Sequence, residues 1–259
     1  MTESLPRWED LPPFAGTIDP SDRVLLIAMT GGAKSTLAAT FLLETDSLVA
    51  IDGKDALILP RARVVQLPPY ADKDEAARAR FDRALAGALA WQTGEHVSRW
   101  RRMTGYRPAP ASNRVVIRAA PEDVDSFAAH DAIFWAIYRT RSDTVVWVDE
   151  ITSTGATPQR TPPGLSAIAA RGRTRGIGLW VLTQAPFGMV PGIVRRNAQY
   201  MIFGPIEPQD ATDVKRPGIE LATRLPTKRG RFIVYRVGDR EPYRLYLPIP
   251  SQLKHWRAP

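Results

Sequence analysis

Short runs of apolar residues alternate along the chain with longer segments in which apolar positions recur every three or four residues. A fully apolar run predicts a strand that helices cover on both faces, whereas the three-to-four spacing predicts a helix with one apolar side. Strands are therefore expected at 24–28, 47–52, 114–118, 144–148, 179–183 and 200–203, and helices at 35–44, 72–91, 124–139, 165–173 and 192–197.

The regular alternation of strands and helices predicts an α/β fold with a mainly parallel central sheet flanked by helices. A shorter run at 64–67 predicts a strand at one edge of that sheet. The segments 231–237 and 243–247 alternate apolar and polar residues on either side of a polar turn, which predicts a C-terminal β-hairpin. Upstream of this hairpin, 205–224 is expected to form one or two short helices.

The chain is organised as one large domain, because no repeat and no shift in composition marks a second one within its 259 residues. Its first residues are rich in proline and predict an irregular arm, in which Trp8 and Phe14 can pack against the same domain or a neighbouring subunit. The predicted divisions are an arm at 1–22, a main domain at 23–247 with an insertion at about 60–113, and a tail at 248–259.

Composition narrows the possible chemistry. The chain has no cysteine, which excludes disulfides and cysteine-bound metals, and its three histidines are too far apart in sequence to favour a histidine metal site. Its 35 basic and 27 acidic residues give a formal net charge of +8, which favours a polyanionic partner, most simply nucleic acid. A GC-rich genome would explain arginine in place of lysine but not the excess of basic over acidic residues.

No apolar run reaches about 18 residues, so no transmembrane helix is expected. The protein is predicted to work in a cytoplasm or inside a particle made there.

The first strand, a loop of small residues and the first helix together match a phosphate-binding loop. The segment 28–35 reads AMTGGAKS, against the pattern G-x-x-x-x-G-K-[ST]. In such a loop, backbone N–H groups and the helix N-terminus hold phosphates, the lysine reaches the β- and γ-phosphates, and the next hydroxyl binds Mg²⁺. Lys34 and Ser35 are predicted to take these roles. The predicted nucleotide-binding residues are Thr30, Gly31, Gly32, Ala33, Lys34, Ser35 and Thr36.

Two alanines stand where that pattern has glycine. Ala28 is at the end of the strand, a position that tolerates a small residue. Ala33 directly precedes the lysine, and a left-handed backbone there would cost an alanine about 1–2 kcal/mol. An ordinary strand–turn–helix is therefore an alternative interpretation of this segment.

Two later strands end in polar residues that suit an ATP site. The run 144–148 ends in Asp149 and Glu150, which predicts a Walker B strand. Asp149 would hold Mg²⁺ through water, and Glu150 would act as general base on the attacking water. The run 179–183 ends at Gln184, whose amide would orient water or sense the γ-phosphate. Polar residues also end many ordinary strands, so the prediction rests on these strand ends occurring together.

Arginine-rich segments supply two further predictions. Arg173 and Arg175 are candidates for an arginine finger delivered to the γ-phosphate of a neighbouring subunit. Arg195 and Arg196 are rivals, and the alternative for all four is a solvated helix end, where arginine complements the helix dipole. The segment 99–107 interleaves arginine with tryptophan and tyrosine, which suits nucleic acid and, equally, a surface loop.

Taken in order, these motifs resemble the FtsK–HerA superfamily of DNA-pumping P-loop ATPases. Members typically show G-x-T-G-x-G-K-[ST], a strand ending Asp-Pro-Lys, an apolar strand ending Asp-Glu, and R-x-x-G-I-x-L followed by T-Q. The matching segments here are 28–35, 51–54, 146–150, 173–179 and 182–186, within a resemblance that covers about 23–247. The sequence departs from the family at Ala28, at Ala33 and at Gly53, where proline is usual.

The resemblance implies a P-loop NTPase fold of the RecA and FtsK–HerA type, ATP and Mg²⁺ as cofactors, and a homo-oligomeric ring, usually a hexamer, that hydrolyses ATP to move double-stranded DNA through its pore. The single-domain size is similar to that of genome-packaging ATPases of tailless, membrane-containing viruses. That similarity implies a location in the host cytoplasm or the virion, with a portal or membrane protein of the virion as a partner. The residues expected to carry catalysis are Glu150, Lys34, Gln184, Arg173 and Arg175, and the loops expected at the pore are 94–113 and 152–164.

Two other functions stay open from the sequence. The methyl group of Ala33 is the reason to consider a subunit that binds nucleotide but hydrolyses it weakly or not at all. A plasmid-transfer or filamentous-phage assembly ATPase would act on single strands or coat protein. The expected mark of that second class is a membrane anchor, and no such segment is expected here.

Overall fold

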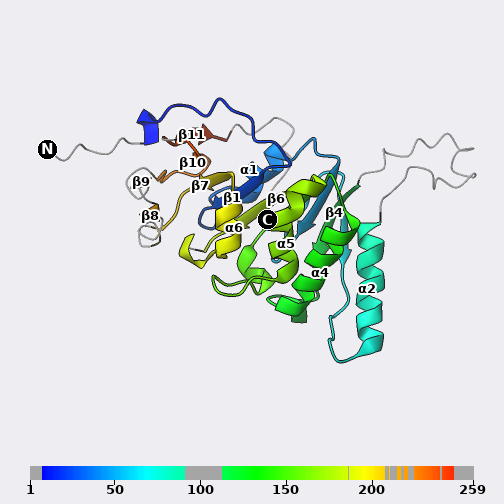
Figure 1. Cartoon of the computed structure of the whole chain (residues 1–259). Helices are drawn as coiled ribbons and strands as arrows, with labels where there is room; N and C mark the ends of the chain where they lie inside the picture. The colour runs from blue at the N-terminus through cyan, green and yellow to red at the C-terminus, as the bar shows by residue number, and fades with distance from the viewer. Residues whose placement is uncertain are drawn as a thin grey trace, which may run out of the picture.

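The computed structural model describes residues 8–90, 113–185, 187–207, 210, 215–216, 219–220, 225–239 and 241–247. These residues form a nine-stranded central sheet (Figure 1). In order across the sheet, its strands are β11 (Tyr243–Tyr246), β10 (Arg231–Arg236), β7 (Tyr200–Phe203), β1 (Arg23–Ile27), β6 (Gly178–Thr183), β5 (Val145–Val148), β2 (Ser47–Ile51), β4 (Asn113–Arg118) and β3 (Arg63–Gln66).

Every neighbouring pair from β7 across to β3 is parallel, whereas β10 pairs antiparallel with both β7 and β11. The predicted mainly parallel sheet and C-terminal hairpin are therefore confirmed, and the predicted edge strand is β3. Strands β1, β2, β5 and β6 are buried along their whole length, which explains why their sequences carry no polar face.

Helices cover both faces of this sheet. They are α1 (Lys34–Phe41), α2 (Glu75–Leu89), α4 (Phe127–Thr140), α5 (Pro163–Arg171) and α6 (Gly192–Asn197), with 3₁₀ turns η1 (Trp8–Asp10), η2 (Pro121–Asp123), η3 (Ile151–Thr154), η4 (Gly172–Arg175) and η5 (Phe187–Met189). Side chains of α2, α4, α5 and α6 pack with one set of alternating strand residues, such as Leu25, and α1 packs with the other set, such as Leu26. None of the helices in the described part of the chain is long and apolar enough to cross a membrane.

In the segment 205–224, the structure describes residues 205–207, 210, 215–216 and 219–220. Residue 210 is helical, as expected, but further along β8 (Lys215–Arg216) pairs antiparallel with β9 (Ile219–Glu220). The sequence between these two strands is Pro217-Gly218, a turn-forming dipeptide that the helical interpretation overlooked.

The described part of the N-terminal arm lies against the strands of the C-terminal hairpin. The indole N–H of Trp8 donates to the carbonyl oxygen of Phe232 at 2.9 Å, and the guanidinium of Arg231 lies over the indole ring. Arg231 also pairs with Glu9 at 2.6 Å. Phe14 packs edge-to-face against two tyrosine rings, with centroids 6.3 and 5.8 Å away. Of the two predicted partners of the arm, its own domain is the one that it contacts here.

A buried arginine fixes the far end of α1. Arg114, in β4, is 1% exposed, and its Nη1 donates to the carbonyl oxygens of Leu42, Leu43 and Thr45 at 2.8 to 3.0 Å. These carbonyls lie at and just beyond the C-terminal end of α1, where the hydrogen bonds of the helix stop, so the guanidinium ties this end of the helix to β4. Because α1 begins at the predicted phosphate loop, Arg114 steadies the helix that carries the loop.

We predict that Arg114→Met lowers the free energy of unfolding by about 2–4 kcal/mol, because the carbonyls of Leu42, Leu43 and Thr45 lose a charged donor that is itself buried. Urea denaturation followed by circular dichroism measures the change. Arg80→Met is the matched control, since Arg80 is exposed on α2 and its loss should change stability by no more than about 0.5 kcal/mol. Equal unfolding midpoints for the two variants would contradict the role given to Arg114.

Candidate functional site

The predicted phosphate loop, the Walker B acids and Gln184 lie at the same edge of the sheet. β1, β6 and β5 are neighbours and run parallel, so the residues that follow each strand emerge together at their carboxyl ends, where α/β proteins place ligands. A cavity of about 360 Å³ opens at this edge. Its lining residues are Thr30, Gly31, Ala33, Lys34, Ser35, Thr36, Lys54, Ala56, Leu57, Asp149, Gln184 and Arg229.

The ammonium of Lys34 lies inside the loop that precedes it. Its Nζ donates to the carbonyl oxygen of Ala28 at 2.6 Å and to that of Met29 at 3.1 Å. The side chain is buried, and burial lowers the pKa of Lys34 to about 8, with the charge of nearby Lys54 adding to the effect. The loop therefore holds a partly desolvated cation that an incoming phosphate would contact.

Ala33 has φ 69° and ψ 27°, the left-handed conformation that glycine usually supplies before the P-loop lysine. Gly31 has φ 76° in the same loop. The alanine thus keeps the backbone shape of the motif and carries the expected strain of about 1–2 kcal/mol. Its half-buried methyl group packs against the core cluster beside α1 while also lining the cavity.

Ala28 is accommodated by two glycines. Its side chain is fully buried, and a Cβ placed on Gly204 would lie 2.7 Å from the Cβ of Ala28. A Cβ placed on Gly32 would lie 3.0 Å from the same atom. The methyl group that departs from the motif therefore occupies space that glycines leave at the end of β7 and within the loop itself.

Ser35 and Asp149 form the predicted metal-binding pair. The Ser35 hydroxyl donates to Asp149 Oδ1 at 2.8 Å, and burial raises the pKa of Asp149. The described residues contain no cluster of three or more His, Cys, Asp or Glu side chains that would hold a metal ion alone. One hydroxyl and one carboxylate fit Mg²⁺ in a nucleotide complex, because Mg²⁺ keeps several waters and takes phosphate oxygens as ligands.

Glu150 is buried, and hydrogen bonds occupy both of its carboxylate oxygens. Oε1 accepts from the hydroxyl of Thr183 at 2.8 Å and from that of Thr152 at 3.1 Å. Oε2 accepts from the backbone N–H of Gln184 at 3.1 Å and pairs with Lys54 Nζ at 3.2 Å. In this arrangement the carboxylate faces protein donors rather than water.

Gln184 joins this acid to the phosphate loop. Its backbone N–H bonds Glu150, while its side-chain oxygen accepts from the hydroxyl of Thr30. The predicted sensor therefore touches the loop on one side and the predicted base on the other.

Arg173 and Arg175 lie elsewhere. They belong to η4, which precedes β6, so the length of that strand separates them from Gln184 at its other end. Arg175 donates to the carbonyl oxygen of Arg141 at 3.2 Å and to that of Arg139 at 3.4 Å. Arg173 is exposed. Neither lines the cavity, so a single chain does not bring them to the other predicted residues.

Four contributors were missed as site residues. Lys54, Thr152 and Thr183 contact Glu150, and Arg229 lines the cavity from the turn before β10. Lys54 follows the buried strand β2, and Thr183 is the last residue of the buried strand β6. Their positions at strand ends could have been recognised from the sequence. Arg229 had no comparable signal, since basic residues occur in many turns. The basic segment 99–107 lies outside the described residues.

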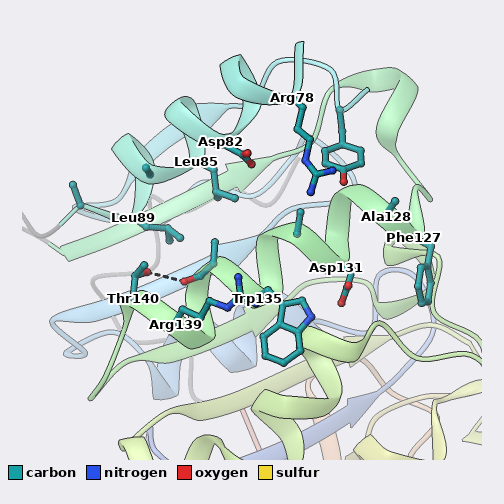
Figure 2. Close-up of a pocket in the computed structure, with 15 residues that line it drawn as sticks. Arg78, Asp82, Leu85, Leu89, Phe127, Ala128, Asp131, Trp135, Arg139 and Thr140 are labelled. Atoms are coloured by element: carbon teal, nitrogen blue, oxygen red, sulfur yellow. Dashed lines mark hydrogen bonds between the residues drawn. The ribbon is translucent and has the colours of Figure 1, made fainter. Parts of the chain in front are cut away.

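A larger cavity of about 760 Å³ lies between α2 and α4 and contains none of the predicted site residues (Figure 2). Leu85 and Leu89 line it from α2, and Trp135 lines it from α4 with the guanidinium of Arg139 over its ring. The polar groups that phosphate binding needs converge on the smaller cavity, which is therefore the candidate site.

No protein-family model and no curated protein matches the chain. Solved structures do. The genome packaging NTPase B204 from Sulfolobus turreted icosahedral virus 2, in complex with AMPPCP, has a TM-score of 0.56 and 18% identity over 90% of this chain and 100% of that chain. VirB4 of Thermoanaerobacter pseudethanolicus has a TM-score of 0.54 and 12% identity over 93% of this chain and 96% of that chain.

The bacterial conjugative coupling protein TrwBΔN70, in complex with sulphate, has a TM-score of 0.53 and 13% identity over 90% of this chain and 86% of that chain. At such identities the comparisons establish the architecture. The chain therefore has the fold of the FtsK–HerA-like P-loop ATPases, as its motifs predicted.

Proposed function

We propose that the protein hydrolyses ATP in a ring of identical subunits and uses the energy to move double-stranded DNA, as the genome-packaging motor of a virus. The observation that carries this proposal is that a phosphate loop and the Ser35–Asp149 pair line one cavity, and that Glu150 bonds two further lining residues, Lys54 and Gln184. The similarity in fold to a protein described as a genome packaging NTPase supports the DNA-packaging role. The net charge of +8 suits a polyanion.

In the proposed reaction, the N–H groups of the loop and the N-terminus of α1 hold the phosphates of ATP, and Lys34 neutralises their charge. Ser35 and Asp149 would hold Mg²⁺, which would supply positive charge to the phosphates. Glu150 accepts a proton from the attacking water. At the same time the water oxygen bonds the γ-phosphorus, and the bond from that phosphorus to ADP breaks. Gln184 orients that water and registers the loss of the γ-phosphate.

The ring is proposed because an arginine from a neighbour would complete the site. Of the two candidates, Arg173 is the better one, since it is exposed while Arg175 is engaged with carbonyl oxygens of its own chain. The loop 152–164 and the segment 94–113 are proposed to face DNA in the pore. The arm and tail divisions at 1–22 and 248–259 remain proposals, as do the virion partner and a location in the host cytoplasm or the virion.

We predict that Glu150→Gln reduces DNA-stimulated ATP hydrolysis by about 10²- to 10⁴-fold while ATP still binds, because an amide cannot take the proton of water. A phosphate-release assay with and without duplex DNA measures this. Glu122→Gln, which removes an exposed acid from η2, should leave the rate unchanged. Hydrolysis that persists in Glu150→Gln would remove the proposed mechanism.

The same assay separates the two other functions. A protein that binds nucleotide and releases no phosphate is the non-hydrolysing subunit that Ala33 suggests. Stimulation by single strands rather than duplex DNA would favour a transfer or phage-assembly ATPase.

We predict that Ala33→Gly raises the free energy of unfolding by about 0.5–1 kcal/mol. Relief of left-handed strain stabilises the folded protein by about 1–2 kcal/mol. The greater flexibility of glycine in the unfolded chain offsets about 0.5–1 kcal/mol of this. The matched control is Ala39→Gly, in the buried interior of α1, which should lower stability by about 1 kcal/mol or more. Urea denaturation of both variants tests whether the two substitutions have opposite signs.

We predict proton uptake on ATP binding above pH 8. The pKa of Lys34 is about 8 in the protein without nucleotide, and the negative charge of a bound polyphosphate raises it again. Binding should therefore take up most of one proton at pH 9 and much less at pH 7. Calorimetry in two buffers of different ionisation enthalpy measures the uptake, and Lys34→Arg, which is charged at both pH values, should abolish it. Equal uptake at the two pH values in the unmodified protein would contradict the role of Lys34.

A further inference from the structure

Lys54 is a second lysine in the phosphate cavity, and the proposed mechanism leaves it without a role. It follows β2, which lies beside β5 in the sheet, and its Nζ is 3.2 Å from Glu150 Oε2. The Lys54 side chain is 37% exposed, whereas that of Glu150 is 8% exposed. A partly solvated cation therefore lies against a buried acid at the mouth of the cavity.

The loop that carries Lys54 is held in a tight turn. The carboxylate of Asp52 is buried, and it accepts from the N–H of Lys54 at 3.0 Å and from that of Leu57 at 2.8 Å. Arg118 Nε pairs with the same carboxylate at 3.1 Å. These bonds fix the backbone at Lys54 and leave its side chain as the part that can move.

Gly53 brings this turn against the loop that follows Glu150. A Cβ on Gly53 would lie 1.8 Å from Ser153 Oγ, so the two loops touch where the glycine has no side chain. Ser153 Oγ also donates to the carbonyl oxygen of Glu150 at 2.7 Å. The resembled family usually has proline at this position, and Ser153 fills the space that a proline ring would need. The loop that carries Lys54 and the loop that follows Glu150 are thus held side by side.

Lys54 has a competing ligand when ATP is present. The γ-phosphate would enter the same cavity with about 1.5 to 2 negative charges, against one on Glu150. A lysine ammonium has three donors on a flexible stem, so it can exchange one anion for another without moving its backbone. ADP lacks the γ-phosphate and offers no such exchange.

We propose that Lys54 is a positioning residue that pairs with Glu150 when no nucleotide is bound and transfers to the γ-phosphate when ATP binds. The transfer frees Glu150 Oε2 to accept the proton of the attacking water, while the water oxygen bonds phosphorus and the bond from phosphorus to ADP breaks. The nucleotide thereby releases its own general base, and ADP leaves that base paired. This inference rests on the proposed function.

Binding measurements test it without hydrolysis. The affinities of AMPPCP and of ADP are measured by calorimetry for the unmodified protein, Lys54→Ala and Lys54→Arg. Lys54→Ala should weaken AMPPCP about tenfold or more and ADP less than about twofold, because only the γ-phosphate contacts the ammonium. Lys54→Arg should recover most of the loss. Lys73→Ala, which removes an exposed lysine, is the control and should change neither affinity.

A second variant distinguishes exchange from simple phosphate contact. Glu150→Gln removes the partner that Lys54 must leave, so it should tighten AMPPCP, and the gain should vanish in the double variant Lys54→Ala, Glu150→Gln. In steady-state hydrolysis, Lys54→Ala should raise the KM for ATP more than it lowers kcat, because Glu150 is then unpaired at all times and only the contact with the γ-phosphate is lost. Equal losses of AMPPCP and ADP affinity, or a Glu150→Gln gain that persists without Lys54, would overturn the inference.

The outcomes also separate this inference from the proposed function. Lys54-dependent preference for AMPPCP in a protein that releases no phosphate would retain the exchange and reject the motor. Unchanged binding and hydrolysis in Lys54→Ala, in a protein that hydrolyses ATP, would reject the exchange alone. A protein that binds neither nucleotide would reject both.

Discussion

The register of the parallel strands β1, β6 and β5 is the constraint on which the candidate site depends. Ile27 is level with Thr183, and Val148 is level with Val181, two residues before that threonine. Glu150 therefore emerges beside Thr183, and the phosphate loop starts on the other side of the same threonine. A slip of one residue in β5 would turn Glu150 to the opposite face of the sheet. The apolar side chains on both faces of the sheet hold this register, so the hydrophobic packing on each face fixes where the residues of the candidate site lie.

The site concentrates charge of both signs without pairing all of it. Lys34 and Lys54 line one cavity, and burial, together with the charge of Lys54, lowers the pKa of Lys34. Asp149 accepts from a serine rather than from either lysine, and its pKa is raised by burial. Such an arrangement is held together by its fold, and its charges are complementary to those of a polyphosphate with a cation.

Local pattern was sufficient for most of the architecture and for the strand-end residues of the site. An apolar run followed by a polar residue is a property of adjacent positions, so Lys34, Asp149 and Gln184 were predictable as neighbours at one edge of a parallel sheet. Their chemical roles remain predictions. Contacts between remote segments left no such signal. The pairing of Lys54 with Glu150 depends on β2 lying beside β5, which is a matter of strand order that the sequence does not encode locally.

Departures from a motif were the hardest features to interpret, because their explanation also lies in contacts that the local pattern does not show. In the sequence, Gly53 is only a departure from the usual proline. The structure explains it, because Ser153 occupies the space beside the glycine. The start of α2 at Glu75 rather than at 72 follows from the Asp74 carboxylate, which accepts from the N–H of Ala77 at 3.0 Å, a capping signal that helical periodicity does not detect.

The contact between Ala28 and Gly204 restricts the order in which this loop can change during evolution. Restoring glycine at position 28 alone would leave a void beside a bare glycine, and enlarging position 204 alone would force two methyl groups to within 2.7 Å. Each single step carries a penalty that the paired exchange lowers. A chain with glycine at 28 and alanine at 204 would remove the contact between the two methyl groups and leave only the ring of Phe232, 3.0 Å from a Cβ at 204, to move aside, so the two positions are coupled even though they are far apart in the sequence. Relatives of this protein with glycine at position 28 should then tolerate alanine at the end of β7 better than this chain does.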